Sequence, residues 1–232
     1  MALAGAAALA TSGMRAAGAA PHQAVLELFT SQGCSSCPPA DALLGELIRR
    51  PGVIGLAWHV DYWDRAGWRD PFSSGTATAR QRSYASVLGD DVYTPALVVN
   101  GAAMMVGSDV GRITAALASP AAFPVAVSLR PEADGLTAAI GSRAEAVTLL
   151  LAFFDAKRET QVGAGENDGR VLREFNIVRS SQRFALPPGE ARDVALRAAP
   201  ASMGTALLVQ DARLRVLGAA MLPPAAAPAT RA

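Results

Sequence analysis

The first half of the chain alternates between short apolar runs and segments with helical spacing. Residues 25–29 and 53–60 are largely apolar runs, which predict buried strands. Between them, residues 41–50 carry leucine and isoleucine at helical spacing, and Pro51 and Gly52 end that helix. Because one helix-length crossover joins the two strands, we expect them to be parallel and the connection to be right-handed.

The next segments continue this alternation. The pattern predicts a helix at 76–88, a strand and turn at 94–101, a returning strand at 102–106 and a helix at 110–117. Asn100-Gly101 is a favoured pair for a two-residue hairpin turn, and Ser108 or Asp109 can cap the last helix. The predicted order is therefore strand, helix, strand, helix, strand, hairpin strand and helix.

The second half contains short strand-like runs separated by turn signals. The runs occupy residues 125–129, 136–140, 147–154, 176–178, 194–196, 206–210 and 214–217. We interpret them as a mainly antiparallel β domain, a sandwich or half-sandwich that packs against the first unit. The predicted organisation is a leader at 1–22, an α/β domain at 23–120, the β domain at 121–222 and a disordered tail at 223–232.

Composition narrows the classes of partner. Of the 232 residues, 51% are hydrophobic and 18% charged, but no run reaches the ~18 uninterrupted apolar residues of a membrane helix. We therefore expect no membrane insertion of the mature chain. The net charge is +1 without a basic block, so nothing favours nucleic acid as a partner.

The N-terminal segment predicts export. Residues 1–20 are rich in alanine, lack acidic residues and end in small residues suited to cleavage, which is typical of a signal peptide and of a periplasmic or secreted protein. The segment departs from a standard signal because no Lys or Arg lies near its start and Arg15 comes late. The alternative is a disordered Ala-rich tail.

Cys34 and Cys37 are the only cysteines, and they lie between the first predicted strand and the first helix. A helix N-terminus lowers the pKa of a thiol, and the thiolate is the nucleophile. We predict that Cys34, the more exposed thiol, attacks, and that the more buried Cys37 resolves the mixed disulfide. The alternative is a structural disulfide or two inert thiols, although a bridge across so short a loop restricts the unfolded chain little.

Several motifs resemble a bacterial family of exported thioredoxin-like proteins of unknown function. They are FTSQGCSSCPPAD at 29–41, WHVDYWD at 58–64, YTP at 93–95, VVNG at 98–101 and GEN at 165–167, followed by Asn176, Val178 and Arg179. The resemblance implies a thioredoxin-like fold for residues 23–120 and a redox site. It also implies a cis bond before Pro95, which turns the backbone of Thr94 toward the dithiol to bind substrate. The alternative for Pro95 is a trans proline that opens an edge strand.

Of the polar residues on or after the first two strands, Glu27 and His59 are candidates for acid–base chemistry and Asp61 is a candidate for substrate binding. The resemblance implies that Glu27 accepts a proton from Cys37; alternatively, Glu27 lies at the open edge of its strand. His59 ends the second strand, at the sheet edge that holds the active site of α/β proteins, so His59 and Asp61 are both expected to face the dithiol. His59 can raise the thiolate fraction, act as an acid–base group or complete a metal site with Cys34 and Cys37. The alternative is a satisfied structural histidine.

A long loop at residues 61–72 contains Trp63 and Trp68. Long loops are often binding elements, so both tryptophans are candidates for substrate binding. The alternative is a lid whose aromatic side chains cover the core, and a mixture of the two is our interpretation. Asp64 and Arg69 can pair within the loop.

The β domain contributes a second polar segment, with Glu166, Asn167 and Arg179 as candidates for substrate binding. These groups either reach the dithiol or line a groove between the domains, which is a usual place for a ligand. The alternative is a solvated hairpin loop.

Three functions are compatible with these residues. The first is a thiol–disulfide oxidoreductase that acts on protein or small thiols, needs no bound cofactor and exchanges electrons with a partner protein. The second is a protein that handles a thiophilic ion such as Cu(I) through Cys34, Cys37 and His59. The third is a non-catalytic binding module with structural cysteines, since a fold does not determine a function.

Overall fold

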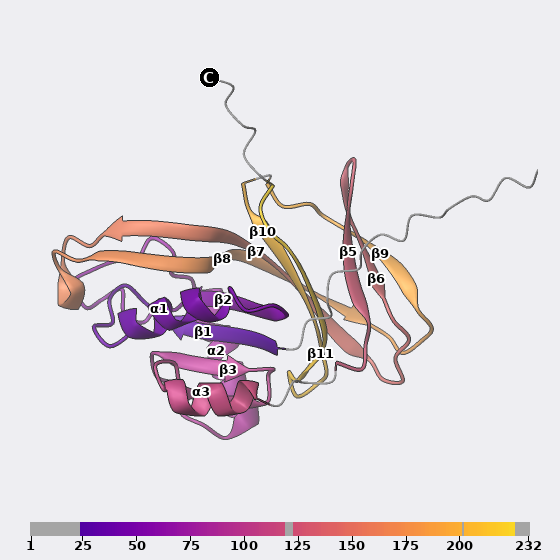
Figure 1. The fold of residues 1–232 in the computed structure, drawn as a ribbon, viewed down its shortest axis with the longest axis horizontal. Helices are drawn as coiled ribbons and strands as arrows, with labels where there is room; N and C mark the ends of the chain where they lie inside the picture. Colours follow the sequence, from indigo (N-terminus) through magenta and orange to yellow (C-terminus); the bar gives the residue numbers. More distant parts are fainter. Residues whose placement is uncertain (1–23, 119–122, 201, 226–232) are drawn as a thin grey trace, which may run out of the picture.

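The computed structural model describes residues 24–118, 123–200 and 202–225. These residues are mostly β-strand with few helices. One mixed sheet has the strand order β11-β10-β7-β8-β2-β1-β3-β4, and a smaller sheet has the order β5-β6-β9 (Figure 1). The predicted leader at 1–22, the predicted boundary at 120/121 and most of the predicted tail at 223–232 lie outside the described residues.

The first half of the chain has the predicted order of elements. Its elements are β1 (Ala24–Thr30), α1 (Pro38–Leu47), β2 (Val53–His59), α2 (Gly75–Leu88), β3 (Ala96–Val99), β4 (Ala103–Val106) and α3 (Val110–Leu117). Strands β1 and β2 are parallel as predicted, and β3 is antiparallel to both β1 and β4. The hairpin turn is confirmed, because Asn100 and Gly101 have φ of 54° and 65°, the left-handed values that this turn requires. Asp109 caps α3 by accepting a hydrogen bond from the Arg112 N–H at 3.0 Å.

The second half forms longer strands than the apolar pattern predicts. Its elements are β5 (Val127–Glu132), β6 (Gly135–Ile140), β7 (Val147–Gln161), the 3₁₀ turn η1 (Gly165–Asn167), β8 (Val171–Leu186), β9 (Arg192–Leu196), β10 (Gly204–Gln210) and β11 (Val216–Leu222). Strands β7 and β8 are antiparallel along nearly their whole length, and β8 also pairs with β2 through Ile177 and Ala57.

The relation between the two halves therefore differs from the prediction. Strands β7, β8, β10 and β11 extend the sheet of the first half, and the small sheet β5-β6-β9 packs over this extension (Figure 1). The outer halves of β7 and β8 form an arm that runs past the end of β2 and carries η1 at its tip. This arm brings residues from the second half to the end of β1.

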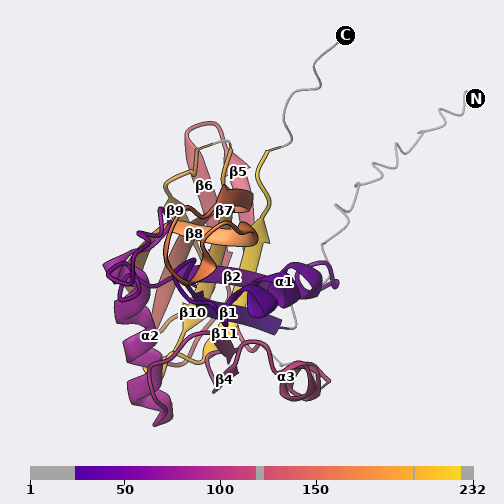
Figure 2. The ribbon, with the colours of Figure 1, turned by 90° about the vertical axis from the view of Figure 1, so that its left-hand side faces the viewer.

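The two faces of the sheet determine which side chains can meet. Helices α1 and α3 lie on one face and α2 on the other (Figure 2). Successive side chains of a strand point to opposite faces, so Leu26 and Leu28 of β1 pack with Leu44 of α1. Val25 and Phe29 belong instead to the core cluster on the α2 face.

Candidate functional site

Cys34 and Cys37 form a disulfide at the start of α1, with Cα atoms 5.4 Å apart. Cys37 is the N-cap of the helix, and Pro38 takes its first position, where proline is favoured because that N–H has no helical partner. Both cysteines are 0% exposed. The prediction of a more exposed Cys34 is therefore wrong for the oxidised protein, although the intervening serines are exposed.

The tip loop, which we define as residues 162–170 at the end of the β7–β8 arm, is hydrogen-bonded to the backbone of the segment that carries the disulfide. The buried Asn167 donates from Nδ2 to the carbonyl oxygens of Gln32 and Cys34, at 2.9 and 3.0 Å. The carboxylate of Glu166 accepts a hydrogen bond from the Ser35 N–H at 2.9 Å. The structure thus brings Glu166 and Asn167 to the dithiol, as one of the sequence interpretations expected.

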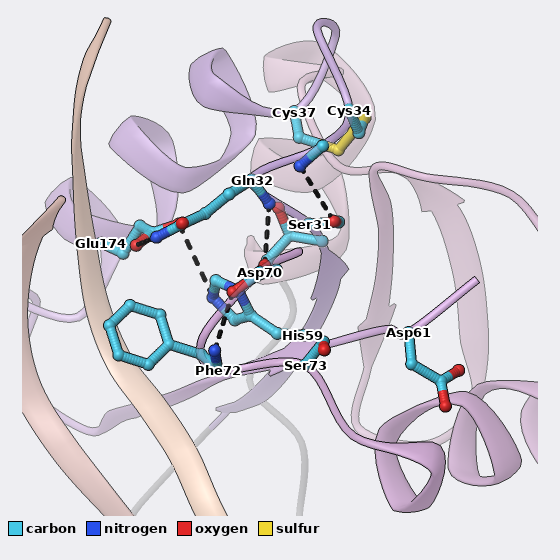
Figure 3. Close-up of polar contacts among 12 residues, drawn as sticks. Ser31, Gln32, Cys34, Cys37, His59, Asp61, Asp70, Phe72, Ser73 and Glu174 are labelled. Carbon is cyan, nitrogen blue, oxygen red and sulfur yellow. Dashed lines mark hydrogen bonds and ion pairs between the residues drawn. A yellow bond between two sulfur atoms is a disulfide. The ribbon is translucent and has the colours of Figure 1, made fainter. Parts of the chain in front are cut away.

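A layer of buried polar residues lies beneath the loop that precedes the disulfide (Figure 3). The Gln32 N–H donates to Asp70 at 2.8 Å, and the Gln32 side chain donates to Glu174 at 2.8 Å. His59 Nδ1 lies 2.6 Å from Asp70 Oδ2, and His59 Nε2 lies 3.8 Å from Glu174 Oε1. The layer therefore joins the end of β2, the loop before α2 and strand β8.

The charges in this layer are coupled. Burial, the largest single effect, would lower the pKa of His59, but Asp70, Glu174 and Asp41 together outweigh it and raise that pKa to about 9, so the imidazole is protonated at neutral pH. Burial acts to raise the pKa of Asp70, yet His59 holds it below its usual value. Burial raises the pKa of Glu174, with His59 opposing the shift.

Asp41, which lies on α1, is the last member of this buried layer. It was not among the site residues predicted from the sequence. Its Oδ2 accepts a hydrogen bond from the Thr30 hydroxyl at 3.2 Å. Burial, with a further contribution from Glu174, raises the Asp41 pKa to about 7. The position four residues after Cys37 was the available signal, because residues i and i+4 lie on one face of a helix. The site thus contains a carboxyl group that can exchange a proton near neutral pH, one turn below Cys37.

Glu27 is the predicted proton acceptor, and the structure gives it a different environment. It is 1% exposed, and Arg80 of α2 donates to both of its carboxylate oxygens. It shares the α2 face of β1 with Val25 and Phe29, whereas Cys37 begins α1 on the other face. The alternative of an open strand edge is also wrong, because β1 pairs with β2 on one side and β3 on the other.

His59 and Asp61 were both expected to face the dithiol. His59 lies in the buried layer, whereas Asp61 points away from the disulfide (Figure 3) and accepts a hydrogen bond from the Thr78 hydroxyl at 2.6 Å. That expectation is wrong for Asp61. The alternative metal site of His59 with Cys34 and Cys37 is not formed either, since no group of three or more His, Cys, Asp or Glu among the described residues is arranged to hold a metal ion.

The loop at residues 61–72, which we call the aromatic loop, packs against the site through both tryptophans. Trp63 Nε1 donates to the Thr94 hydroxyl at 2.8 Å, and Trp68 Nε1 donates to Gln32 Oε1 at 3.0 Å. The bond between Thr94 and Pro95 is cis, as the resemblance implied. Both tryptophans are therefore packed as the lid interpretation expected, and their part in substrate binding stays a prediction.

Two predicted side chains lie elsewhere. Asp64 bonds to the Ser73 hydroxyl and the Asp70 N–H rather than pairing with Arg69. Arg179 donates to Asp155 at 2.9 Å and has its guanidinium carbon 4.8 Å from the centre of the Phe72 ring. These contacts place Arg179 beside the aromatic loop. They give it no hydrogen bond to residues 32–37, which we call the cysteine segment.

Comparisons with known proteins show one family and two solved structures to which the chain is similar. A family model described as "Protein of unknown function (DUF1223)" matches residues 25–210. The crystal structure of protein AGR_C_4864 from Agrobacterium tumefaciens is 30% identical, with 92% of this chain and 99% of that chain covered and a TM-score of 0.78. HBP35 of Porphyromonas gingivalis is 15% identical, with 91% and 79% covered and a TM-score of 0.63, which shows similarity of fold alone. No curated protein matches the chain.

Among residues 24–118, 123–200 and 202–225, no helix is long and apolar enough to cross a membrane.

Proposed function

The chain belongs to the DUF1223 family of proteins of unknown function, and from its own site we propose that it is a thiol–disulfide oxidoreductase on a thioredoxin-like scaffold. The observation that carries this proposal is the Cys34–Cys37 disulfide at the N-terminus of α1, with the Asp41 carboxyl one helical turn away.

The order of the first four strands supports the proposed thioredoxin-like scaffold. Strands β2-β1-β3-β4 are adjacent in that order, β1 and β2 are parallel, and β3 and β4 complete an antiparallel hairpin. Helices α1 and α3 cover one face and α2 the other. This is the arrangement that the resemblance to thioredoxin-like proteins implied, and in such a sheet the end of β1 is a usual place for a site.

The position of the disulfide supports exchange chemistry. A bridge between residues three apart restricts the unfolded chain little, so it contributes little stability by that route. A thiolate at the N-terminus of a helix is stabilised by the helix dipole, and a stabilised thiolate is both a nucleophile and a leaving group. The prediction that Cys34 attacks and Cys37 resolves is retained in the proposal.

Asp41 supplies the proton transfer that exchange requires. When a substrate thiolate attacks Cys34 Sγ, the Sγ–Sγ bond breaks and Cys37 leaves as a thiolate, which takes a proton from Asp41. A second substrate thiolate then attacks its own mixed-disulfide sulfur, so the substrate is oxidised and Cys34 is released reduced. A cavity of about 360 Å³ beside this helix is lined by Pro38, Asp41, Ala42 and residues 170–173.

An oxidising compartment fits this chemistry. Disulfides persist in the periplasm and in secreted proteins, and they are rare where thiol reductants are abundant. We propose a periplasmic or secreted location on this basis.

A binding module with a structural disulfide is the second candidate function. The complete burial of both cysteines is the observation that favours it. The two candidates differ in one property, because a structural disulfide does not exchange with substrate thiols.

Trapping of mixed disulfides tests the proposed function. In the reductive direction Cys34 attacks a substrate disulfide and Cys37 then resolves the mixed disulfide, so Cys37→Ser should accumulate covalent complexes with substrate proteins that a thiol reductant reverses. Cys34→Ser is the matched control and should accumulate none. Non-reducing electrophoresis of cells that express each variant provides the readout, and equal trapping by both variants, or by neither, would contradict the assigned roles.

A further inference from the structure

The oxidised site poses a problem for any substrate, because no part of Cys34 is accessible. Exchange begins when a thiolate approaches a disulfide sulfur, yet Cys34 and Cys37 are both 0% exposed. Some part of the cover must therefore move before exchange. The tip loop (residues 162–170) is bonded to the backbone beside the disulfide and is the segment that we consider for this movement.

Asn167 joins the tip loop to the cysteine segment through side-chain hydrogen bonds. Arg170 donates to Asn167 Oδ1 at 2.7 Å. Because a guanidinium only donates hydrogen bonds, the oxygen of the amide must face Arg170, and its nitrogen must face the carbonyls of Gln32 and Cys34. Arg170 thus orients the amide that closes the site.

The tip loop makes two further contacts with the surroundings of the disulfide. Glu166 accepts from the Ser35 N–H. Gly165 packs closely against the aromatic loop, where a Cβ atom on Gly165 would lie 3.1 Å from the Ala66 carbonyl oxygen and 3.2 Å from the Trp68 Cβ. The tip loop is therefore seated against both the cysteine segment and the aromatic loop.

The tip loop is attached to the arm in a way that permits movement. Its contacts with the cysteine segment are polar, and they span more than 130 positions of sequence. Gly163 lies on one side of η1 and Gly169 on the other, and Gly169 has a φ of +75°. Short segments next to element ends that can change φ and ψ are the usual hinges of lids.

Resting on the proposed function, we propose that the tip loop is a lid that closes the disulfide to small thiols, and that the site accepts a polypeptide dithiol that displaces this lid. Displacement leaves the Gln32 and Cys34 carbonyls and the Ser35 N–H without partners. A polypeptide backbone supplies N–H donors and carbonyl acceptors for these groups, whereas a small thiol supplies fewer of them. The lid therefore selects for substrates with an amide backbone.

The test compares the rate of reduction of the Cys34–Cys37 bond by dithiothreitol and by an unstructured ten-residue peptide with a Cys-x-x-Cys dithiol, each per thiolate. In either case a thiolate attacks Cys34, Cys37 leaves and takes a proton, and the second thiolate of the reductant releases Cys34. The wild type should react at least about tenfold faster with the peptide, because the peptide replaces the hydrogen bonds of the lid.

Asn167→Ala removes both amide donors and should raise the dithiothreitol rate about tenfold or more, with a smaller gain for the peptide. Glu166→Gln changes an exposed side chain, weakens the bond to Ser35 and should raise the dithiothreitol rate about threefold without loss of folding. The matched control is Lys157→Ala, an exposed change on the same arm that should leave both rates unchanged.

Equal dithiothreitol rates for the wild type and both tip-loop variants would overturn the proposal that the tip loop is a lid. Equal wild-type rates for the peptide and dithiothreitol would overturn the substrate class. The midpoint potential of the dithiol tests the proposed function separately, because it is an equilibrium property that does not depend on how quickly the lid opens.

Discussion

Replacement of Asp41 by asparagine should stabilise the folded protein, and more so at high pH. The pKa of Asp41 rises from 3.8 to about 7 on folding, mainly because the carboxyl is buried. Between these two values the folded state retains a proton that the unfolded state has released, so stability falls as pH rises through this window. The full loss, reached above pH 7, amounts to roughly 4 kcal/mol.

Asparagine retains the shape of the side chain but does not ionise, so Asp41→Asn should abolish this loss. The stability difference between the variant and the wild type should widen by about 3 kcal/mol between pH 5 and pH 8. Urea unfolding of the oxidised proteins at four pH values measures it. Glu46→Gln, which changes an exposed carboxyl on the same helix, is the matched control and should follow the wild type.

A difference that stays constant from pH 5 to pH 8 would refute the reasoning, because it would mean that Asp41 does not retain its proton in the folded state. The same variant should slow exchange near neutral pH, since Cys37 then loses its proton donor. A variant that is more stable but exchanges at the wild-type rate would show that Asp41 does not donate the proton to Cys37.

Two further predictions concern the other buried charges. Arg80→Ala leaves the Glu27 carboxylate buried without its partner and should lower the free energy of unfolding by roughly 3–5 kcal/mol. The double variant Arg80→Met and Glu27→Gln should partly restore this free energy. A loss below about 1 kcal/mol for Arg80→Ala in urea unfolding would contradict the prediction. Asp70→Asn removes the main group that raises the His59 pKa, so that pKa should fall from about 9, and an imidazole titration by NMR that still gives about 9 would exclude the pairing. In the wild type, the stability that comes from the raised His59 pKa is fully present below pH 6.5 and is lost as pH rises through about 9.

The element order of the first half could be predicted because each of its elements buries an apolar side. Strand β1 is buried along its whole length, and α1 packs its leucines on that strand. The arm could not be predicted in the same way. Residues 156–159 at the outer end of β7 are exposed, so their strand conformation depends on the ladder with β8 rather than on an apolar pattern. Backbone pairing of this kind leaves little trace in the order of side chains.

The cysteine pair could be identified from sequence, but most of its surroundings could not. Glu174 and Asp70 reach the site through contacts between distant segments, and local patterns do not encode these contacts. Asn167 was a candidate from its polar segment, but the sequence did not decide between a contact with the dithiol and a solvated loop. The same limitation explains the error about Cys34, because the loop that bonds to its carbonyl lies more than 130 residues further along the chain. Glu27 was misread for the related reason that its partner, Arg80, lies on a helix of low apolar content.

The midpoint potential of the Cys34–Cys37 pair tests the central claim most directly. Purified protein is equilibrated in glutathione buffers until the thiol count is constant, and the fraction of reduced protein is plotted against the potential of the buffer. A thiol–disulfide oxidoreductase should show a reversible two-electron transition between roughly −120 and −270 mV. A bond that remains oxidised below about −300 mV would contradict the account and would identify the disulfide as structural.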